Sequence, residues 1–285
     1  MSIQKLGIVG SGIMGSGIAE VAAKAGIEVV LRSRQQASAD DMVASLEKSL
    51  AKQVDRGKLE EAAAKEIGGR VTATDDLQLL ADCDLVLESV VEDLAVKKEL
   101  FRQLDGVVKA DGILATNTST LPVVELAVTT NRPEQVVGIH FFNPAPMMSL
   151  VEVIAPLTAS DATVDAAKAF AAGCGKDVVE VKDRAGFIVN ALLFPYLNNA
   201  VRMLESGTAS RDDIDTAMKG GCNFPMGPLA LLDLVGLDTS LSILDALYDE
   251  FKDPNYAAVP LLRRMVTAGQ LGRKSGSGFH DYRKK

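Results

Sequence analysis

The sequence predicts an α/β protein, in which a domain built on a mostly parallel sheet (residues 1–183) is followed by an all-helical domain (residues 184–285). Three observations predict this. Short apolar runs alternate with helical stretches in the first part, which is typical of parallel strands joined by crossover helices. A glycine-rich turn follows the first apolar run. From about residue 184 the strand pattern stops and helical signals continue. A chain of 285 residues is long enough for two such domains.

Six apolar runs are the strand candidates of the first domain. In chain order they are KLGIVG (5–10), IEVVLR (27–32), DLVLESV (84–90), GILATN (112–117), VVGIHFF (136–142) and VEVIAP (151–156). Between the first two runs a helix is expected. Its apolar face would hold Ile18, Val21, Ala22 and Ala25, Glu20 and Lys24 would pair one turn apart, and Gly26 would end it.

The remaining segments read as helices and turns. Residues 40–66 are charged and rich in Ala and Lys, which predicts a helical hairpin broken at Gly57. The stretch KDVVEVKDRAG (176–186) closes the strand pattern. Beyond it, Pro195 should kink a helix, and ASRDDIDTAM (209–218) carries a helix-capping signal.

Composition limits the class of protein. Hydrophobic residues make up 47% and charged residues 24% of the chain, a globular balance, and the net charge of −8 argues against a nucleic-acid partner. Cys83, Cys174 and Cys222 form no CxxC pair, so we expect buried thiols in a reducing compartment and no metal site. No apolar run is long enough to span a membrane, and the chain opens directly on a strand. These features predict a soluble, cytoplasmic protein.

The first strand candidate leads into the pattern Gly10-x-Gly12-x-x-Gly15. Gly10 permits a tight turn, Gly12 lets the backbone approach a pyrophosphate, and Gly15 allows close packing of helix on strand. The intervening Ser11, Ile13 and Met14 belong to the same predicted cofactor site. Such a turn between strand and helix predicts a Rossmann-type dinucleotide site, although methyltransferases share a similar turn.

The second strand candidate ends in Arg32, Ser33 and Arg34. An acidic residue about 20 positions after the glycine turn usually binds the ribose of NAD, and Ser33 stands in that place. Arginines cannot accept hydrogen bonds from a ribose diol, but they can bind a phosphate. Two charge-assisted hydrogen bonds of about 1.5–3 kcal/mol each would favour NADP over NAD by about 10²-fold. We therefore expect NADP(H) to be favoured and NAD(H) possible; the alternative is that both arginines are solvated.

One of the two histidines is a candidate catalytic group. His140 lies at the end of a strand candidate, where ligands and catalytic groups gather in open α/β sheets. Glu152, in the next run, needs a partner if buried, and His140 would serve. The polar run TNTST (116–120) follows another strand and suggests a polar pocket at the same edge, although it could simply cap a turn. His280, near the C-terminus, is expected at the surface.

Several motifs together resemble the short-chain L-3-hydroxyacyl-CoA dehydrogenases, and most of all bacterial 3-hydroxybutyryl-CoA dehydrogenases. They are GIVGSGIMGSGIAEVAAKAG (7–26), NTST (117–120), GIHFFNPAPMMSLVEVI (138–154), KDRAGFIVNALLFPYLNNAVRM (182–203), PMGPLALLDLVGLD (225–238) and LGRKSGSGFHDY (271–282). The resemblance covers nearly the whole chain. It departs from the family at Ser33, where the family usually has an acidic residue.

The resemblance implies roles for individual residues. It makes His140 the catalytic acid/base and Glu152 its orienting partner, with Ser119 on the 3-oxygen of the substrate. Asn190 would hold the thioester end, and Asn143 would support the His–Glu pair at the substrate site. The cofactor would also contact Glu92, Lys97, Asn117 and Lys274; coenzyme A would lie near Ser49, Lys52 and Arg56.

The expected reaction interconverts a (3S)-3-hydroxyacyl-CoA and a 3-oxoacyl-CoA. Three alternatives stay open: a dehydrogenase of the same family that acts on a non-CoA hydroxy acid or an acyl-carrier-protein substrate, a recruited nucleotide-binding structural protein, and a methyltransferase. The helical domain is so apolar around MGPLALLDLVGL (226–237) that a homodimer through it is expected.

Overall fold

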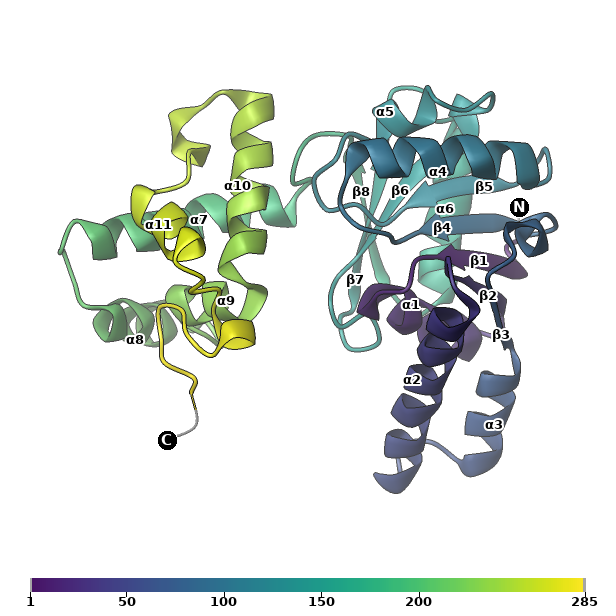
Figure 1. The fold of residues 1–285 in the computed structure, drawn as a ribbon, viewed down its shortest axis with the longest axis horizontal. Coiled ribbons are helices and arrows are strands. Elements are labelled where there is room, and N and C mark those ends of the chain that lie inside the picture. The colour runs from purple at the N-terminus through teal and green to yellow at the C-terminus, as the bar shows by residue number, and fades with distance from the viewer. Residues whose placement is uncertain (1, 284–285) are drawn as a thin grey trace. The chain divides into compact units, whose positions relative to one another are not determined.

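The computed structural model describes residues 2–283. The chain divides between Asp183 and Arg184 into two compact units, shown in Figure 1. Unit 1 contains an eight-stranded sheet in the order β3-β2-β1-β4-β5-β6-β7-β8. Neighbouring strands are parallel except β6 and β7, which are antiparallel. The strands are β1 (Lys5–Val9), β2 (Glu28–Arg32), β3 (Val71–Thr74), β4 (Leu85–Glu88), β5 (Ile113–Thr116), β6 (Val136–Phe141), β7 (Leu150–Ala155) and β8 (Asp177–Lys182).

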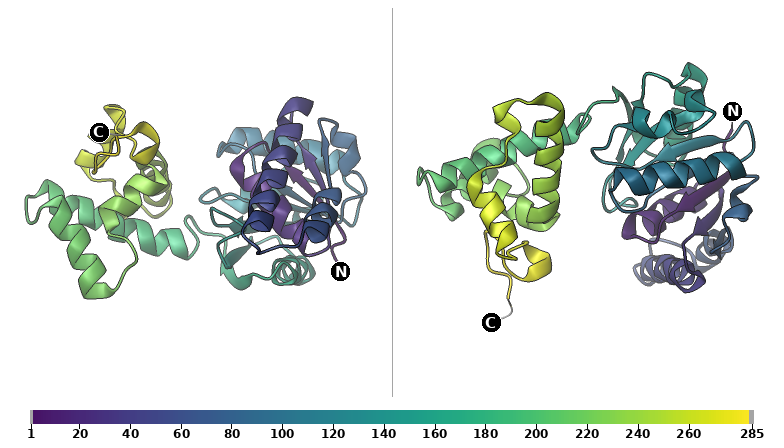
Figure 2. Two further views of the ribbon diagram at one scale, coloured as in Figure 1. Left: turned by 90° about the horizontal axis from the view of Figure 1, so that it is seen from below. Right: turned by 45° about the horizontal axis from the view of Figure 1, so that its top comes forward.

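Helices cover both faces of this sheet (Figures 1 and 2). The helices are α1 (Ile13–Lys24), α2 (Gln36–Asp55), α3 (Glu61–Gly69), α4 (Leu94–Val107), α5 (Val123–Ala127) and α6 (Asp161–Gly173), with 3-10 turns η1 (Leu77–Leu80) and η2 (Pro133–Gln135). Apolar side chains of α1, α2 and α6 form one continuous core with the strands. The helices α4 and α5 lie on the opposite face of the sheet (Figure 1). Successive residues of a strand point to opposite faces, so both faces are packed against helices. Because both faces are covered, the central strands are almost wholly apolar.

The order of strands places a switch point between β1 and β4, where the chain changes direction across the sheet. Ligands in open α/β sheets bind at such a point, outside the carboxyl ends of the strands. The residues after β1, β4 and β5 therefore lie where a ligand site is expected.

The helices α2 and α3 run side by side and project from the sheet (Figures 1 and 2). Gly57, between them, has φ 65°, a left-handed conformation that glycine adopts without strain. The predicted helical hairpin is confirmed. The predicted Glu20–Lys24 pair is also present, with 2.6 Å between Lys24 Nζ and Glu20 Oε1.

Unit 2 is helical, as predicted. It holds α7 (Val189–Glu205), α8 (Arg211–Cys222), α9 (Pro228–Val235), α10 (Leu237–Phe251) and α11 (Pro260–Thr267), with 3-10 turns η3 (Pro254–Tyr256) and η4 (Arg273–Ser275). Their apolar faces share a core of their own. The capping signal is confirmed, because Ser210 Oγ accepts a hydrogen bond from Asp213 N–H at 3.2 Å.

The predicted fold class is thus confirmed, with some differences in detail. The edge strand β3 is absent from the strand candidates, because VTAT is short and partly exposed. The expectation of buried thiols holds for Cys83, and its burial raises the pKa of this thiol to about 12. Cys222, in contrast, is exposed. His280 is not a free surface side chain, since its Nε2 lies 2.8 Å from Asp215 Oδ2. None of the helices in residues 2–283 combines the length and the apolar character needed to cross a membrane.

Candidate active site

The glycine turn after β1 is tightly packed on one side and open on the other. Gly10 has φ 139°, and a Cβ there would lie 2.2 Å from the Ser89 carbonyl oxygen. A Cβ on Gly15 would lie 2.7 Å from Met42 Cε, so α1 packs closely against α2 at this position. At Gly12, by contrast, a Cβ would meet nothing within 4 Å. The turn is therefore tight on the protein side and open beside the first N–H groups of α1, so it fits an anionic cofactor group.

The side chains of the glycine turn and of the first turn of α1 differ in solvent exposure. Ser11 and Ile13 are exposed, and Met14 is half-buried against the core.

The end of β2 carries the two arginines. Arg32 is half-buried, and its Nε donates to the Asp75 carbonyl oxygen at 3.3 Å. Burial lowers the pKa of Arg32, Asp75 opposes this shift, and the neighbouring Arg34 adds to it. Ser33 is buried and Arg34 is exposed. No carboxylate stands in the sequence position that the ribose of NAD usually needs.

The strands β6 and β7 bring His140 and Glu152 together. The two residues are direct partners in the antiparallel register. His140 Nδ1 lies 2.8 Å from Glu152 Oε2, and His140 is 4% and Glu152 0% exposed. A carboxylate at Nδ1 favours the proton on that nitrogen and leaves Nε2 to exchange a proton with a ligand. The predicted pairing is therefore present.

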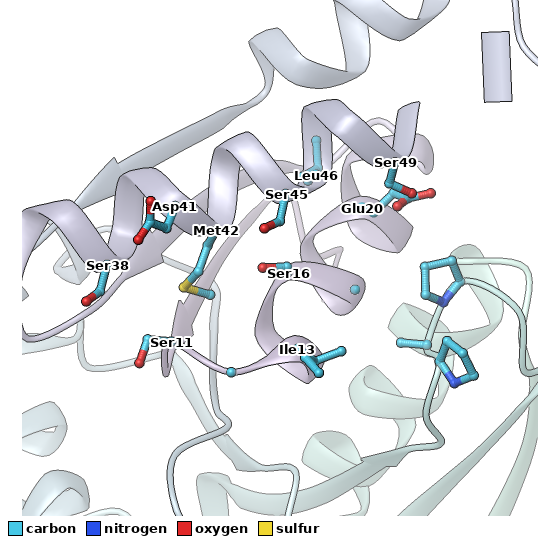
Figure 3. Close-up of a pocket in the computed structure, with 15 residues that line it drawn as sticks. Ser11, Ile13, Ser16, Glu20, Ser38, Asp41, Met42, Ser45, Leu46 and Ser49 are labelled. Carbon is cyan, nitrogen blue, oxygen red and sulfur yellow. The ribbon is translucent and has the colours of Figure 1, made fainter. Parts of the chain in front are cut away.

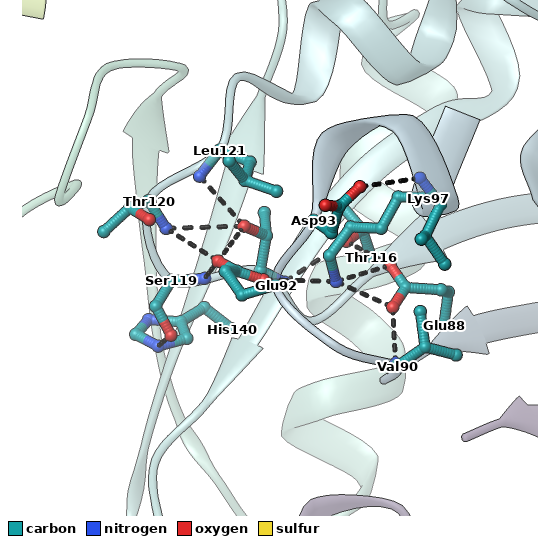
Figure 4. Close-up of polar contacts among 12 residues, drawn as sticks. Glu88, Val90, Glu92, Asp93, Lys97, Thr116, Ser119, Thr120, Leu121 and His140 are labelled. Atoms are coloured by element: carbon teal, nitrogen blue, oxygen red, sulfur yellow. Dashed lines mark hydrogen bonds and ion pairs between the residues drawn. The ribbon is translucent and has the colours of Figure 1, made fainter. Parts of the chain in front are cut away.

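On the other side of the imidazole, His140 Nε2 lies 3.3 Å from Ser119 Oγ (Figure 4). Ser119 belongs to the turn after β5. Asn117, in the same segment, accepts a hydrogen bond from Phe141 N–H at 2.8 Å and so ties this turn to β6. A buried acid–imidazole pair with a hydroxyl at the second ring nitrogen can move a proton to or from an alcohol oxygen.

Two further predicted residues hold this turn in place. Glu92 Oε1 accepts hydrogen bonds from Thr118 Oγ1 at 2.5 Å and Ser119 N–H at 2.8 Å. Partial burial would raise the pKa of Glu92, but the Lys97 ammonium and these hydrogen bonds outweigh it and lower the pKa. Lys97 itself is only 1% exposed. Glu88, which lies beside Lys97, is a buried acid that the sequence predictions omit, although an acid closing an apolar strand is a recognisable signal.

A cavity of about 420 Å³ lies between α1, α2 and residues 144–146, as Figure 3 shows. Its lining includes Ser11, Gly12 and Ile13 from the glycine turn and Ser49 from α2. Ser49 therefore lines the same cavity as the glycine turn. Lys52 and Arg56 do not line this cavity; both are exposed, on α2 and just after it.

Three further predicted residues lie outside the lining of this cavity. Asn143 is exposed, follows β6, and precedes Pro144 through a cis peptide bond. Asn190 is buried at the start of α7 in unit 2. Lys274, in η4, pairs with Asp238 at 2.6 Å. Within residues 2–283, no group of three or more His, Cys, Asp or Glu side chains is arranged to hold a metal ion.

Comparison with known proteins identifies the family. The model of "3-hydroxyacyl-CoA dehydrogenase, NAD binding domain" matches residues 5–184, and that of "3-hydroxyacyl-CoA dehydrogenase, C-terminal domain" matches residues 186–282. The chain is 49% identical over 280 residues to the 3-hydroxybutyryl-CoA dehydrogenase of Clostridioides difficile, covering 98% of this chain and 100% of that protein.

Two crystal structures are similar over the same length. FadB2 of Mycobacterium tuberculosis has a TM-score of 0.97 and 48% identity, covering 99% of this chain and 100% of that one. The (S)-3-hydroxybutyryl-CoA dehydrogenase PaaH1 of Ralstonia eutropha has a TM-score of 0.97 and 42% identity, with coverage of 99% and 100%. With both family models matched and these identities across the chain, this protein belongs to the 3-hydroxyacyl-CoA dehydrogenases, a family of nicotinamide-dependent oxidoreductases.

Proposed function

We propose that this chain interconverts (3S)-3-hydroxybutyryl-CoA and acetoacetyl-CoA, with NADP(H) favoured over NAD(H). The observation that carries the proposal is the buried His140–Glu152 pair with the Ser119 hydroxyl beside His140 Nε2, on the same unit as the glycine turn. The names of the similar proteins support the choice of a four-carbon acyl-CoA.

The nicotinamide supplies or accepts the hydride at C3 of the substrate. The chain's residues handle the proton. In the oxidative direction His140 Nε2 takes the hydroxyl proton, and Glu152 stabilises the resulting imidazolium. Ser119 donates a hydrogen bond to the substrate oxygen and stabilises its developing charge. In this proposal Asn190 helps to hold the thioester end of the substrate, and Asn143 supports the His140–Glu152 pair.

In the same proposal residues 1–183 form the dinucleotide-binding domain, and residues 184–285 the substrate and dimerisation domain. The glycine turn (Gly10–Gly15) holds the pyrophosphate, and Arg32, Ser33 and Arg34 hold the 2′-phosphate. Glu92 lies on the nicotinamide-ribose side, and Asn117 and Lys274 are also proposed cofactor contacts. Lys97, which is 1% exposed and held by Glu88 and Glu92, acts on the ribose side through Glu92.

The direct test is to measure reduction of acetoacetyl-CoA with NADPH and with NADH. We expect turnover with both and a higher kcat/KM with NADPH. Turnover with a free hydroxy acid or an acyl-carrier-protein substrate, and none with the CoA ester, would instead support the alternative substrate. Nucleotide binding without any turnover would support a structural role, and binding of S-adenosylmethionine a methyltransferase.

The CoA ester should be recognised through its phosphates. Ser49, Lys52 and Arg56 lie along α2 and its end, and both cations are exposed. We expect Lys52→Glu/Arg56→Glu to raise the KM for acetoacetyl-CoA by roughly tenfold at low salt, and less at high salt, since exposed charges are screened. Acetoacetyl-pantetheine, which lacks the nucleotide, should be unaffected.

The control for this experiment is Arg102→Glu/Lys182→Glu, which reverses two exposed charges elsewhere in the same unit. An equal rise in KM for the CoA ester and the pantetheine ester would contradict CoA recognition at these residues.

We also propose a homodimer through the helical unit. Apolar side chains stay accessible there, among them Leu192 at 73% and Leu234 at 48% exposure. Water contact at such side chains is unfavourable, and a second copy would cover them. Sedimentation should give a particle of twice the 30.2 kDa chain mass. A single-chain particle at micromolar concentration would contradict this.

A further inference from the structure

A buried ion pair joins β4 to α4 beside the Ser119 turn (Figure 4). Glu88 is 0% exposed, and its carboxylate accepts four hydrogen bonds. Lys97 Nζ donates to both oxygens, at 2.7 and 2.9 Å. Thr116 Oγ1 donates at 2.7 Å and Val90 N–H at 2.6 Å. Glu88 therefore connects the ends of β4 and β5 to the first turn of α4.

Lys97 connects Glu88 to Glu92, which binds the Ser119 turn. Its ammonium also lies 3.2 Å from Glu92 Oε2. The other oxygen of Glu92 accepts hydrogen bonds from Thr118 Oγ1, Ser119 N–H and, at 3.3 Å, Thr120 N–H. Lys97 Nζ thus donates two hydrogen bonds to Glu88 and forms an ion pair with Glu92. The hydrogen bonds to Glu88 therefore restrict the position of the Lys97 ammonium relative to the Glu92 carboxylate.

Stability alone does not explain such a pair. Desolvation of two buried charges often cancels their attraction, so apolar residues of similar volume would serve a structural purpose equally well. The pair does, however, hold the Glu92 carboxylate, which accepts hydrogen bonds from the backbone N–H groups of Ser119 and Thr120. The Ser119 hydroxyl lies 3.3 Å from His140 Nε2, so its placement depends on that turn.

We propose that Glu88 is a positioning residue, which acts through Lys97 and Glu92 to place the Ser119 hydroxyl against His140. The inference rests on the proposed function. Glu88 touches neither Ser119 nor His140 in the hydrogen bonds described above.

Glu88→Gln tests the idea. A glutamine has one acceptor oxygen where Glu88 has two, and its NH₂ group would face the Lys97 ammonium. Lys97 would then move towards Glu92 and loosen the Glu92 bonds to the turn. We expect kcat for acetoacetyl-CoA reduction to fall by roughly 10–100-fold, because a misplacement of about 1 Å can cost about 10²-fold. KM for the cofactor should rise less than kcat falls, although Glu92 is also a proposed cofactor contact.

A double-mutant cycle with Ser119→Ala separates positioning from general damage. If Glu88 acts through the Ser119 hydroxyl, Glu88→Gln should cost no more than about twofold once that hydroxyl is absent. An equal loss in both backgrounds would overturn the proposal, as would a loss confined to cofactor KM. Glu99→Gln, at an exposed position of α4, is the matched control and should leave kcat unchanged.

Amide hydrogen exchange gives a readout that needs no turnover. Exchange at Ser119 and Thr120 should rise by about tenfold or more in Glu88→Gln and stay unchanged in Glu99→Gln. Unaltered protection would overturn the proposal even if the wild-type chain proved inactive on acetoacetyl-CoA, a result that would count against the proposed function alone. If Glu88→Gln does not fold, Glu88→Asp keeps the charge, withdraws the carboxylate, and should show the same changes to a smaller degree.

Discussion

His140→Gln is expected to lower kcat for acetoacetyl-CoA reduction by about 10²–10⁴-fold, the usual contribution of a positioned general acid or base. A glutamine amide can still donate to the buried Glu152, so the fold should survive and the loss should report chemistry. KM should change far less than kcat, because His140 acts on the proton in the transition state.

The second histidine offers a matched control. His280 also pairs with a carboxylate, at 2.8 Å from Asp215, but it lies in the C-terminal segment of unit 2. His280→Gln should leave kcat unchanged. Glu152→Gln should share most of the His140→Gln loss, because an amide cannot stabilise an imidazolium as a carboxylate does. A His140→Gln enzyme within tenfold of wild-type kcat would contradict the assignment.

The sequence was sufficient to predict much of the first unit, because its strands are apolar and its turns use glycine where the backbone needs it. Gly10, with φ 139°, and Gly57, with φ 65°, are examples. The His140–Glu152 pair was predictable as a partnership between a strand-end histidine and an acid in an apolar run. That the two are register partners could be known only from the structure, since β6 and β7 could have paired in another register.

Other features depend on contacts between residues far apart in the chain. His280 and Asp215 are 65 residues apart, so nothing local links them. Lys97 reads as an ordinary helix cation, and only the packing of α4 on the sheet buries it against Glu88. The strand β3 is too short for its period-2 pattern to be distinctive.

Arg32→Ala/Arg34→Ala is expected to reduce kcat/KM for NADPH by about 10²-fold or more while NADH changes little, since each charge-assisted hydrogen bond contributes about 1.5–3 kcal/mol. Arg32 should account for the larger share. Its Nε is already held by the Asp75 carbonyl oxygen, so fewer rotamers are lost when its remaining N–H groups bind a phosphate. Arg34 is exposed and must be ordered by the ligand.

The comparison of single variants tests this physical reason as well as the cofactor preference. Arg32→Ala should cost NADPH more than Arg34→Ala does, and both effects should shrink as salt rises, more steeply for the exposed Arg34. Arg102→Ala, an exposed arginine on α4, serves as the control for simple loss of positive charge. If NADPH and NADH lose activity in parallel, the two arginines do not read the 2′-phosphate. Ser33 would then stand in the ribose position without a phosphate contact to explain the missing acid, and the preference would have to come from elsewhere in the cofactor site.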